Sequence, residues 1–247
     1  MQQFRTGFST NTPPVVKNLI IINVLMLLAT YILSMRGIDL ADTLGLHYFS
    51  SEKFRPFQLV THLFMHGGFT HLLFNMFALW MFGRVLENVW GPKRFFVYYF
   101  VTGLGAAALH TFVNFLEYQS LIGKMTPEMV DMVLREGTAA WDQGKNFTDP
   151  LMAKLNAVIN TPTVGASGAV FGILLGFGML FPNTQLMLIF PPIPIKAKYF
   201  VIGYGVLELY LGLTQSASNI AHFAHLGGML FGFILIKYWN KNSRNFY

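Results

Sequence analysis

Long apolar stretches dominate the hydrophobic pattern of this chain, and polar connections separate them. A helix needs about 20 mostly apolar residues to cross a bilayer, and somewhat fewer where the bilayer is thin. Six segments meet this requirement: residues 18–35, 70–90, 94–116, 165–181, 198–214 and 220–239. The pattern therefore predicts an all-α polytopic membrane protein in which residues 18–239 form a bundle of six transmembrane helices.

Two of the connections are long. The first, residues 36–69, ends in an apolar, histidine-containing stretch that we expect to lie in the membrane interface. The second, residues 117–163, contains the helix start signals Thr126-Pro127-Glu128 and Asp149-Pro150, which predict a helical insertion outside the membrane. The first of these helices has an apolar stripe that consists of Met125, Met129, Met132 and Val133. We interpret the stripe as packing on the protein, in preference to contact with lipid or with a partner.

Composition strengthens the membrane assignment. Hydrophobic residues make up 53% of the chain and charged residues only 11%, against about 25% charged in ordinary soluble domains. The formal net charge is +6, but no Lys/Arg run or basic patch with interleaved aromatic residues accompanies it, so no nucleic-acid partner is expected. Cysteine is absent, which excludes a disulfide framework, a thiolate metal site and a cysteine nucleophile.

The positive charges instead indicate the orientation in the membrane. They concentrate on the side that holds both chain ends, whereas those of the other side are diluted over the two long acidic loops. Residues 1–17 and 240–247 are therefore predicted to be cytoplasmic, and the insertion extracytoplasmic. No small-residue cleavage site precedes the first span, so that span is expected to stay in the mature protein.

The fourth apolar segment contains a candidate nucleophile. It begins with Gly165-Ala166-Ser167-Gly168, and glycines recur along it at helical spacing, as a smooth ridge that another backbone can approach closely. Ser167 lies beside this ridge. Taken alone, Ser167 is interpreted more readily as a membrane serine that bonds back to a carbonyl of its own helix.

A candidate base lies in the sixth segment, in the motif His222-x-x-His225. His225 shares a helix face with Gly228 and Gly232, and this face is expected to meet the glycine ridge of the fourth segment. A serine hydroxyl is a weak nucleophile until an adjacent base activates it, and such a close approach would let His225 do so. A histidine that only hydrogen-bonds across the helix interface is the alternative.

The second apolar segment supplies candidate oxyanion donors. His71 and Asn75 are four residues apart, share a helix face and can both present N–H groups near the extracytoplasmic surface. The alternative here is a metal site, because His62-x-x-x-His66 has plausible ligand spacing. The chain lacks a His-Glu-x-x-His pattern and a carboxylate close to these histidines in the span, so no metal is expected.

These motifs together resemble the rhomboid family of intramembrane serine proteases, of the bacterial type. The resemblance runs from Lys17 to about Trp239 and has four elements in order: Thr61-His62-x-x-x-His66 with His71-Leu72-Leu73-Phe74-Asn75, Phe82-Gly83-Arg84-x-x-Glu87-x-x-Trp90-Gly91, Gly165-Ala166-Ser167-Gly168, and His222-x-x-His225-x-Gly227-Gly228. It implies a rhomboid-like bundle of six helices that cleaves transmembrane protein substrates in the bilayer of the cytoplasmic membrane, without metal or other cofactor.

The resemblance also implies roles for single residues. Ser167 would be the nucleophile and His225 the base of a Ser–His dyad that lacks a carboxylate. His71, Asn75 and the Ser167 backbone N–H would form the oxyanion hole. The supporting residues would be Gly165, Gly168, Phe171 and His222.

The sequence departs from the family pattern at two places. Phe57-Gln58 stands where family members often have Trp-Arg, which alters a feature that anchors the first loop. Phe171 stands where some members have Tyr, so its ring can stack on the base but cannot hydrogen-bond to it.

Two other functions compete with proteolysis. A catalytically inactive relative would bind transmembrane clients, but such proteins usually lack the serine or the histidine, and both are present here. A small transporter would show inverted repeats and broken helices, which the sequence does not show. Glu208, inside the fifth segment, is the best support for a transporter, and we interpret it as an isolated, hydrogen-bonded structural carboxyl.

Overall fold

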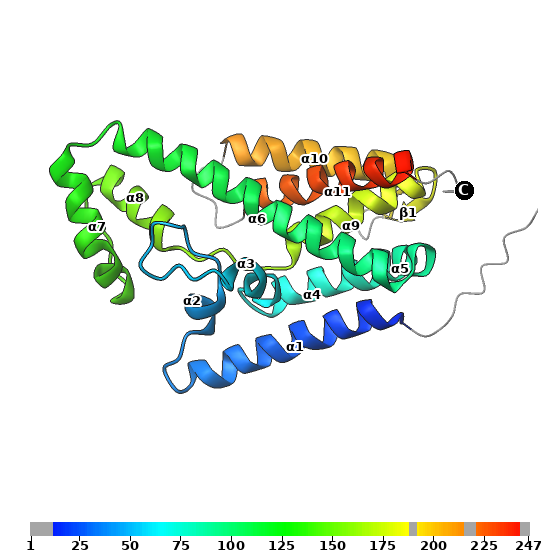
Figure 1. Cartoon of the computed structure of the whole chain (residues 1–247), viewed down its shortest axis with the longest axis horizontal. Helices are drawn as coiled ribbons and strands as arrows, with labels where there is room; N and C mark the ends of the chain where they lie inside the picture. Colours follow the sequence, from blue (N-terminus) through cyan, green and yellow to red (C-terminus); the bar gives the residue numbers. More distant parts are fainter. Residues whose placement is uncertain (1–11, 188–191, 215–220, 243–247) are drawn as a thin grey trace, which may run out of the picture.

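The computed structural model describes residues 12–187, 192–214 and 221–242. Long helices run side by side in a bundle, and a smaller helical unit projects from one end of it (Figure 1). The bundle helices are α1 (Pro14–Ser34), α4 (Phe69–Ala78), the π-helix η2 (Leu79–Gly83), α5 (Arg84–Trp90), α6 (Pro92–Ile122), α9 (Ser167–Leu180), α10 (Ala197–Thr214) and α11 (His222–Asn242). The all-α membrane fold predicted from the sequence is confirmed.

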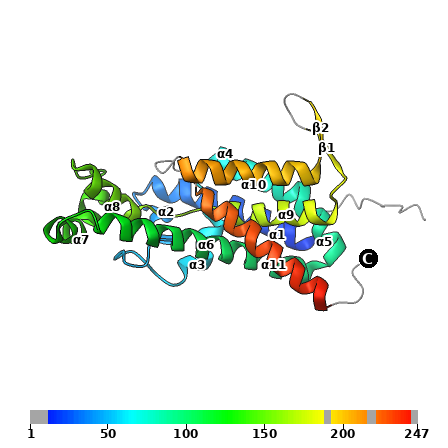
Figure 2. The ribbon, with the colours of Figure 1, turned by 90° about the horizontal axis from the view of Figure 1, so that it is seen from above.

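Shorter elements fill the connections. The first long loop contains α2 (Leu40–Leu44), α3 (Gln58–Thr61) and the 3-10 helix η1 (His62–Phe64), and the insertion contains α7 (Pro127–Asp142) and α8 (Pro150–Asn160). An antiparallel hairpin, β1 (Gln185–Met187) with β2 (Pro194–Lys196), joins α9 to α10 and stands out beyond the bundle in Figure 2. Its register pairs Gln185 with Lys196.

Each predicted span coincides with a helix to within a few residues, except that α6 continues six residues further. Within the described residues, three helices are long and apolar enough to cross a membrane, namely Pro14–Ser34, Phe69–Trp90 and Pro92–Ile122, and α9 is a shorter apolar helix. The number of six spans stays a prediction. The predicted terminal segments lie largely outside the described residues, as does residue 220, the start of the sixth predicted span.

The outer helices expose large apolar side chains, which is the surface expected of a protein surrounded by lipid. On α1 these include Leu25, Leu28 and Ile32, and on α10 they include Ile202, Val206 and Leu213. Both helices lie at the outside of the bundle (Figures 1 and 2). Since soluble monomers rarely expose such continuous apolar faces, the exposure supports a multi-pass membrane protein.

Two backbone N–H groups at the start of α1 are capped by a side chain from another helix. The Glu87 carboxylate on α5 accepts hydrogen bonds from the N–H groups of Val15 (2.9 Å) and Val16 (2.8 Å). The first turn of a helix leaves its N–H groups without intrahelical partners, and a negative charge is favourable there. Glu87 therefore anchors α1 to the rest of the bundle.

Small residues bring α6, α9 and α11 into close contact, although not in the way the sequence predicts. A Cβ atom placed on Gly228 of α11 would lie 1.8 Å from the Gly168 carbonyl oxygen of α9, so these two helices do touch through glycines. Gly172 of α9 instead faces Thr102 of α6, and Gly232 of α11 faces Tyr98 of the same helix. The predicted ridge-to-ridge contact is right at the end near Ser167 and wrong further along, where both glycines pack against α6.

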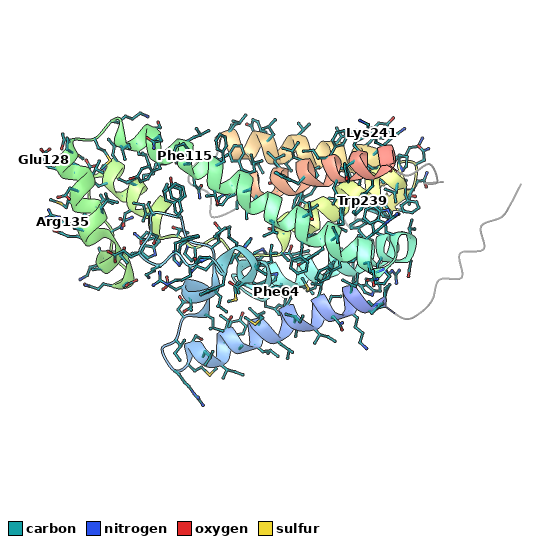
Figure 3. All side chains as sticks on the ribbon, in the orientation of Figure 1. Phe64, Phe115, Glu128, Arg135, Trp239 and Lys241 are labelled. Atoms are coloured by element: carbon teal, nitrogen blue, oxygen red, sulfur yellow. The ribbon has the colours of Figure 1, made fainter. Side chains whose placement is uncertain are left out.

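The helix that leads into the insertion is longer than the predicted span, because α6 continues to Ile122 as a 31-residue helix. Both predicted start signals are confirmed, since Thr126 caps α7 and Asp149 caps α8 with their side chains. Figure 3 shows Glu128 and Arg135 on the outer side of α7, with Trp239 and Lys241 toward the opposite end of the molecule.

The insertion has a small apolar core of its own. Val133 is buried there with Leu121 and Leu155, and Met125 and Met129 pack against it, whereas Met132 is exposed. The preferred interpretation of the stripe, packing on the protein, is thus correct for all its members except Met132.

Lys53 ties the first loop to the insertion, because its ammonium pairs with Asp42 (2.9 Å) and with Asp142 at the end of α7. Burial acts to lower the pKa of Lys53, but the bonds to Asp142 and Asp42 outweigh it and raise that pKa above its ordinary value. The lysine is therefore charged at neutral pH.

Candidate functional site

Ser167 is the first residue of α9, and the turn before it is held by the first loop. Thr163 forms two backbone hydrogen bonds with Leu46, of 2.8 and 2.9 Å, and the Gly165 N–H donates to the His62 carbonyl at 2.9 Å. Gly165 has φ +128°, a conformation that residues with a side chain rarely adopt. The glycine and these bonds together place the Ser167 hydroxyl at the start of the helix.

A buried glutamine, Gln58, anchors the first loop, and this loop in turn holds the turn before Ser167. Gln58, 1% exposed, accepts hydrogen bonds from the backbone N–H groups of His47 (3.3 Å) and Arg55 (3.1 Å). Its amide donates to the carbonyls of Thr43 (3.1 Å) and Lys53 (2.9 Å). The departure from the family pattern at Phe57-Gln58 is thus compensated, because Gln58 itself anchors the loop.

We expect Gln58→Leu to destabilise the protein by about 2–4 kcal/mol, because it leaves four backbone groups with no partner in place of the amide. Gln119→Leu, on the exposed side of α6, is the matched control. Thermal unfolding in detergent would measure both variants. Equal stability of the two variants would contradict an anchoring role for Gln58.

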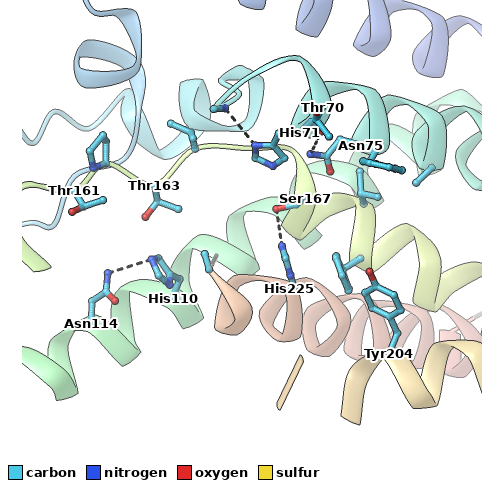
Figure 4. Close-up of a pocket in the computed structure, with 18 of the residues that line it drawn as sticks. Thr70, His71, Asn75, His110, Asn114, Thr161, Thr163, Ser167, Tyr204 and His225 are labelled. Carbon is cyan, nitrogen blue, oxygen red and sulfur yellow. Dashed lines mark hydrogen bonds between the residues drawn. The ribbon is translucent and has the colours of Figure 1, made fainter. Parts of the chain in front are cut away.

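The structure brings Ser167 and His225 together. Nε2 of His225 on α11 lies 2.9 Å from Oγ of Ser167 on α9, within hydrogen-bonding distance (Figure 4). Phe171, one turn into α9, stacks on the His225 ring with a centroid separation of 4.1 Å and an interplanar angle of 5°. The imidazole is therefore held flat against α9 while its Nε2 faces the hydroxyl.

A carboxylate lies at the other nitrogen of this imidazole. Oε2 of Glu208 on α10 is 2.9 Å from Nδ1 of His225 and 2.7 Å from Nδ1 of His222. The interpretation of Glu208 as an isolated carboxyl is wrong, because it contacts both histidines of the His222-x-x-His225 motif. So is the expectation that the Ser–His pair lacks a neighbouring carboxylate.

His71 and Asn75 lie at the same end of the cavity as Ser167 and His225 (Figure 4). A Cβ atom on Gly165 would lie 3.1 Å from Nε2 of His71 and 3.5 Å from Oγ of Ser167, so His71 and Ser167 both lie against this glycine and a side chain there would crowd them. The Asn75 amide donates one hydrogen bond to the His71 carbonyl (3.0 Å). One amide hydrogen therefore remains for another acceptor.

His66 packs edge-on against His71, with 5.1 Å between the ring centroids. Burial lowers the pKa of His66 to about 4, and the neighbouring His71 adds to this effect. His66 is thus neutral at pH 7 and places no charge beside His71.

The residues lie on a cavity of about 1240 Å³ that continues from the bundle to the insertion. Away from Ser167 it is lined by His110 and Asn114 of α6, whose Nε2 and Nδ2 atoms are 3.3 Å apart (Figure 4). Ala157 and Val158 of α8 also line the cavity. The sequence alone did not identify these lining residues. The insertion is therefore part of the cavity wall.

Glu208, His222 and His225 also have a geometry that fits a metal ion, since one ligand atom from each lies within 4.8 Å of the others. His62 and His66, the pair considered from sequence, are not part of this group. In the described part of the chain the three side chains already contact one another directly, through Oε2 of Glu208.

Comparison with known proteins gives a single family. A family model described as the Rhomboid domain matches residues 53–241. RHOMBOID-like protein 12, mitochondrial, of Arabidopsis thaliana is 30% identical over 172 residues, which cover 69% of this chain and 42% of that protein. Rhomboid protein 1, mitochondrial, of Saccharomyces cerevisiae is 25% identical over 183 residues, which cover 74% of this chain and 42% of that protein.

A bacterial protein is similar as well. The Bacillus subtilis protein named "Putative rhomboid protease YdcA" is 28% identical over 178 residues, which cover 72% of this chain and 64% of that protein. The chain spans less than two thirds of the length of each of these three relatives. They come from mitochondria and from a bacterium, so they do not distinguish the bacterial type from the others.

Proposed function

The chain belongs to the rhomboid family, and on this basis we propose that it is an intramembrane serine endopeptidase. It hydrolyses peptide bonds in or near the transmembrane segments of other membrane proteins. The observation that carries the proposal is the 2.9 Å contact between Oγ of Ser167 and Nε2 of His225. This contact joins two helices far apart in sequence and pairs a hydroxyl with a base, as nucleophilic catalysis requires.

In the first step, Oγ of Ser167 attacks the scissile carbonyl carbon while its proton passes to Nε2 of His225. The resulting tetrahedral intermediate collapses as the C–N bond breaks, and His225 returns the proton to the leaving amine. An ester to Ser167 remains. Water then attacks this ester, again with His225 as base, which releases the acid product and restores the hydroxyl.

The oxyanion that forms twice in this sequence needs N–H donors. We assign one donor to Nε2 of His71, because a Cβ atom on Gly165 would lie 3.1 Å from this nitrogen and 3.5 Å from Oγ of Ser167, which places the imidazole close to the nucleophile. We assign the remaining donors to the free amide hydrogen of Asn75 and to the Ser167 backbone N–H, at the start of α9. That N–H has no intrahelical partner, and the helix dipole favours negative charge near it.

The cavity supports a membrane-protein substrate. It has room for an extended peptide, it passes Ser167 and His225, and it continues along α8 of the insertion. We therefore propose that the substrate chain on one side of the scissile bond lies in the bundle and that the substrate chain on the other side lies along the insertion.

The insertion is on the side of Ser167, as expected if both termini are cytoplasmic in a cytoplasmic membrane. Labelling an introduced Gly144→Cys from outside intact cells would test this orientation.

The proposed reaction is tested with the purified protein in detergent, a single-span test substrate and a fluorophosphonate probe. We expect cleavage, and a probe adduct on the peptide that contains Ser167. A chelator should leave both unchanged, because this chemistry uses no metal. Cleavage that a chelator stops would contradict the serine mechanism, and binding of the substrate without cleavage or adduct would favour a client-binding relative.

A further inference from the structure

The helices α9, α10 and α11 together contain a single acidic residue, Glu208, and this residue lies beside the base. Glu208 is 6% exposed, in contact with His222 (4% exposed) and His225 (8% exposed). A carboxylate in a membrane-spanning helix is unfavourable unless it is paired, so its position calls for an explanation. The same carboxylate oxygen contacts both His222 and His225.

The two nitrogens of His225 are used for different partners. Nε2 faces Oγ of Ser167 at 2.9 Å, and Nδ1 faces Oε2 of Glu208, also at 2.9 Å. The resulting chain of contacts, hydroxyl to imidazole to carboxylate, is the arrangement that serine hydrolases of several unrelated folds share. Here it is assembled from three helices.

We infer that Glu208 is a positioning residue for His225, so that the reacting group is a Ser167–His225–Glu208 triad rather than a dyad. The inference rests on the proposed function. When His225, 8% exposed, takes the Ser167 proton it becomes a largely buried cation, and a carboxylate 2.9 Å away stabilises that cation. The negative charge beside Nδ1 also favours the tautomer with hydrogen on Nδ1, which leaves the Nε2 lone pair for the hydroxyl.

His222 fixes the carboxylate in turn. Its Nδ1 makes a hydrogen bond of 2.7 Å to Oε2 of Glu208, whereas the N–H direction of His225 Nδ1 is not well aligned with that oxygen. The alignment indicates that Glu208 acts on His225 mainly through its charge. The two histidines of the motif His222-x-x-His225 then have different roles: His222 holds the carboxylate, and His225 transfers the proton.

A carboxylate that only links α10 to α11 would have the same contacts, so the test separates charge from packing. Glu208→Gln keeps the shape and removes the charge, and Glu208→Asp keeps the charge. Glu136→Gln is the matched control, because it makes the same chemical change on the exposed surface of α7. The measurements are kcat and KM on the single-span substrate, together with thermal unfolding in detergent.

We expect Glu208→Gln to lower kcat at least about tenfold, with KM and the unfolding temperature little changed, and Glu208→Asp to retain more activity. The corresponding change in a soluble triad lowers kcat by about 10⁴. Wild-type kcat in Glu208→Gln, or a loss of activity that follows the unfolding temperature, would overturn the inference. A wild-type protein that neither cleaves nor labels at Ser167 would instead refute the proposed function.

A second variant covers the case in which Glu208→Gln does not fold. Glu208→Ala leaves space beside Nδ1 of His225, and added formate should raise its kcat severalfold while formamide does not. A purely structural carboxyl gives no such charge-specific recovery. Equal response to formate and formamide would also overturn the inference.

Discussion

Ser167→Ala is expected to abolish cleavage of the single-span substrate while the protein remains folded. The hydroxyl is the proposed nucleophile, and its 2.9 Å contact with Nε2 of His225 is the contact through which its proton leaves. Loss of a serine nucleophile or of its base lowers kcat by about 10⁶ in a soluble protease. We expect a decrease of at least about a thousandfold here. Product formation in detergent and thermal unfolding measure the two parts of this result.

His225→Ala should have a similar effect, and the double variant should be no worse than either single one, because the two groups act as a unit. Ser120→Ala, on an exposed part of α6, is the matched control and should cleave like the wild type. Cleavage that persists in Ser167→Ala would refute the assignment of the nucleophile. A double variant much slower than both single variants would show that the two residues do not act together.

The sequence predicts well what depends on local patterns. Apolar runs locate the bundle helices to within a few residues at most ends, and the caps Thr126 and Asp149 mark the starts of α7 and α8 correctly. The end of α6 was missed because its last turns, up to Ile122, are polar and lie beyond the apolar run. Hydropathy alone says little about a helix that continues out of the membrane.

Contacts between distant segments are predicted less well. Glu208 was interpreted as isolated because its partners follow fourteen and seventeen residues later, on a different helix, and no spacing rule links them. Likewise, glycine spacing indicates that a helix face is small but not which helix covers it, so the position of α6 beside Gly172 was missed. Such pairings depend on how the helices pack, which the pattern of a single helix does not contain.

The contact between Gly168 and Gly228 is the exception. Here the spacing of small residues did predict a close approach, and it places Ser167 beside His225. The prediction held at this point because both helices have glycine at the level of the reacting groups. The geometry of Ser167 and His225 was therefore accessible from sequence, whereas the support behind His225 was not.

Gly165→Ala is expected to remove most activity although Ser167 and His225 themselves are not substituted. The new methyl group would lie 2.9 Å from Cε1 and 3.1 Å from Nε2 of His71, so it would displace the imidazole that is assigned as an oxyanion donor. Loss of one oxyanion donor typically lowers kcat by about 10²–10³, so we expect a decrease of at least about a hundredfold in kcat. KM should change less, because the substrate is bound along the whole cavity.

The same substitution forces a residue with a side chain to adopt φ +128°, which costs about 1–3 kcal/mol. Gly203→Ala on α10 is the matched control, because a Cβ there meets no atom within 4 Å. Kinetics on the single-span substrate, together with thermal unfolding, separate the displacement of His71 from backbone strain. If Gly165→Ala kept the wild-type kcat, His71 would not be an oxyanion donor, and the donors would have to be sought elsewhere in the cavity.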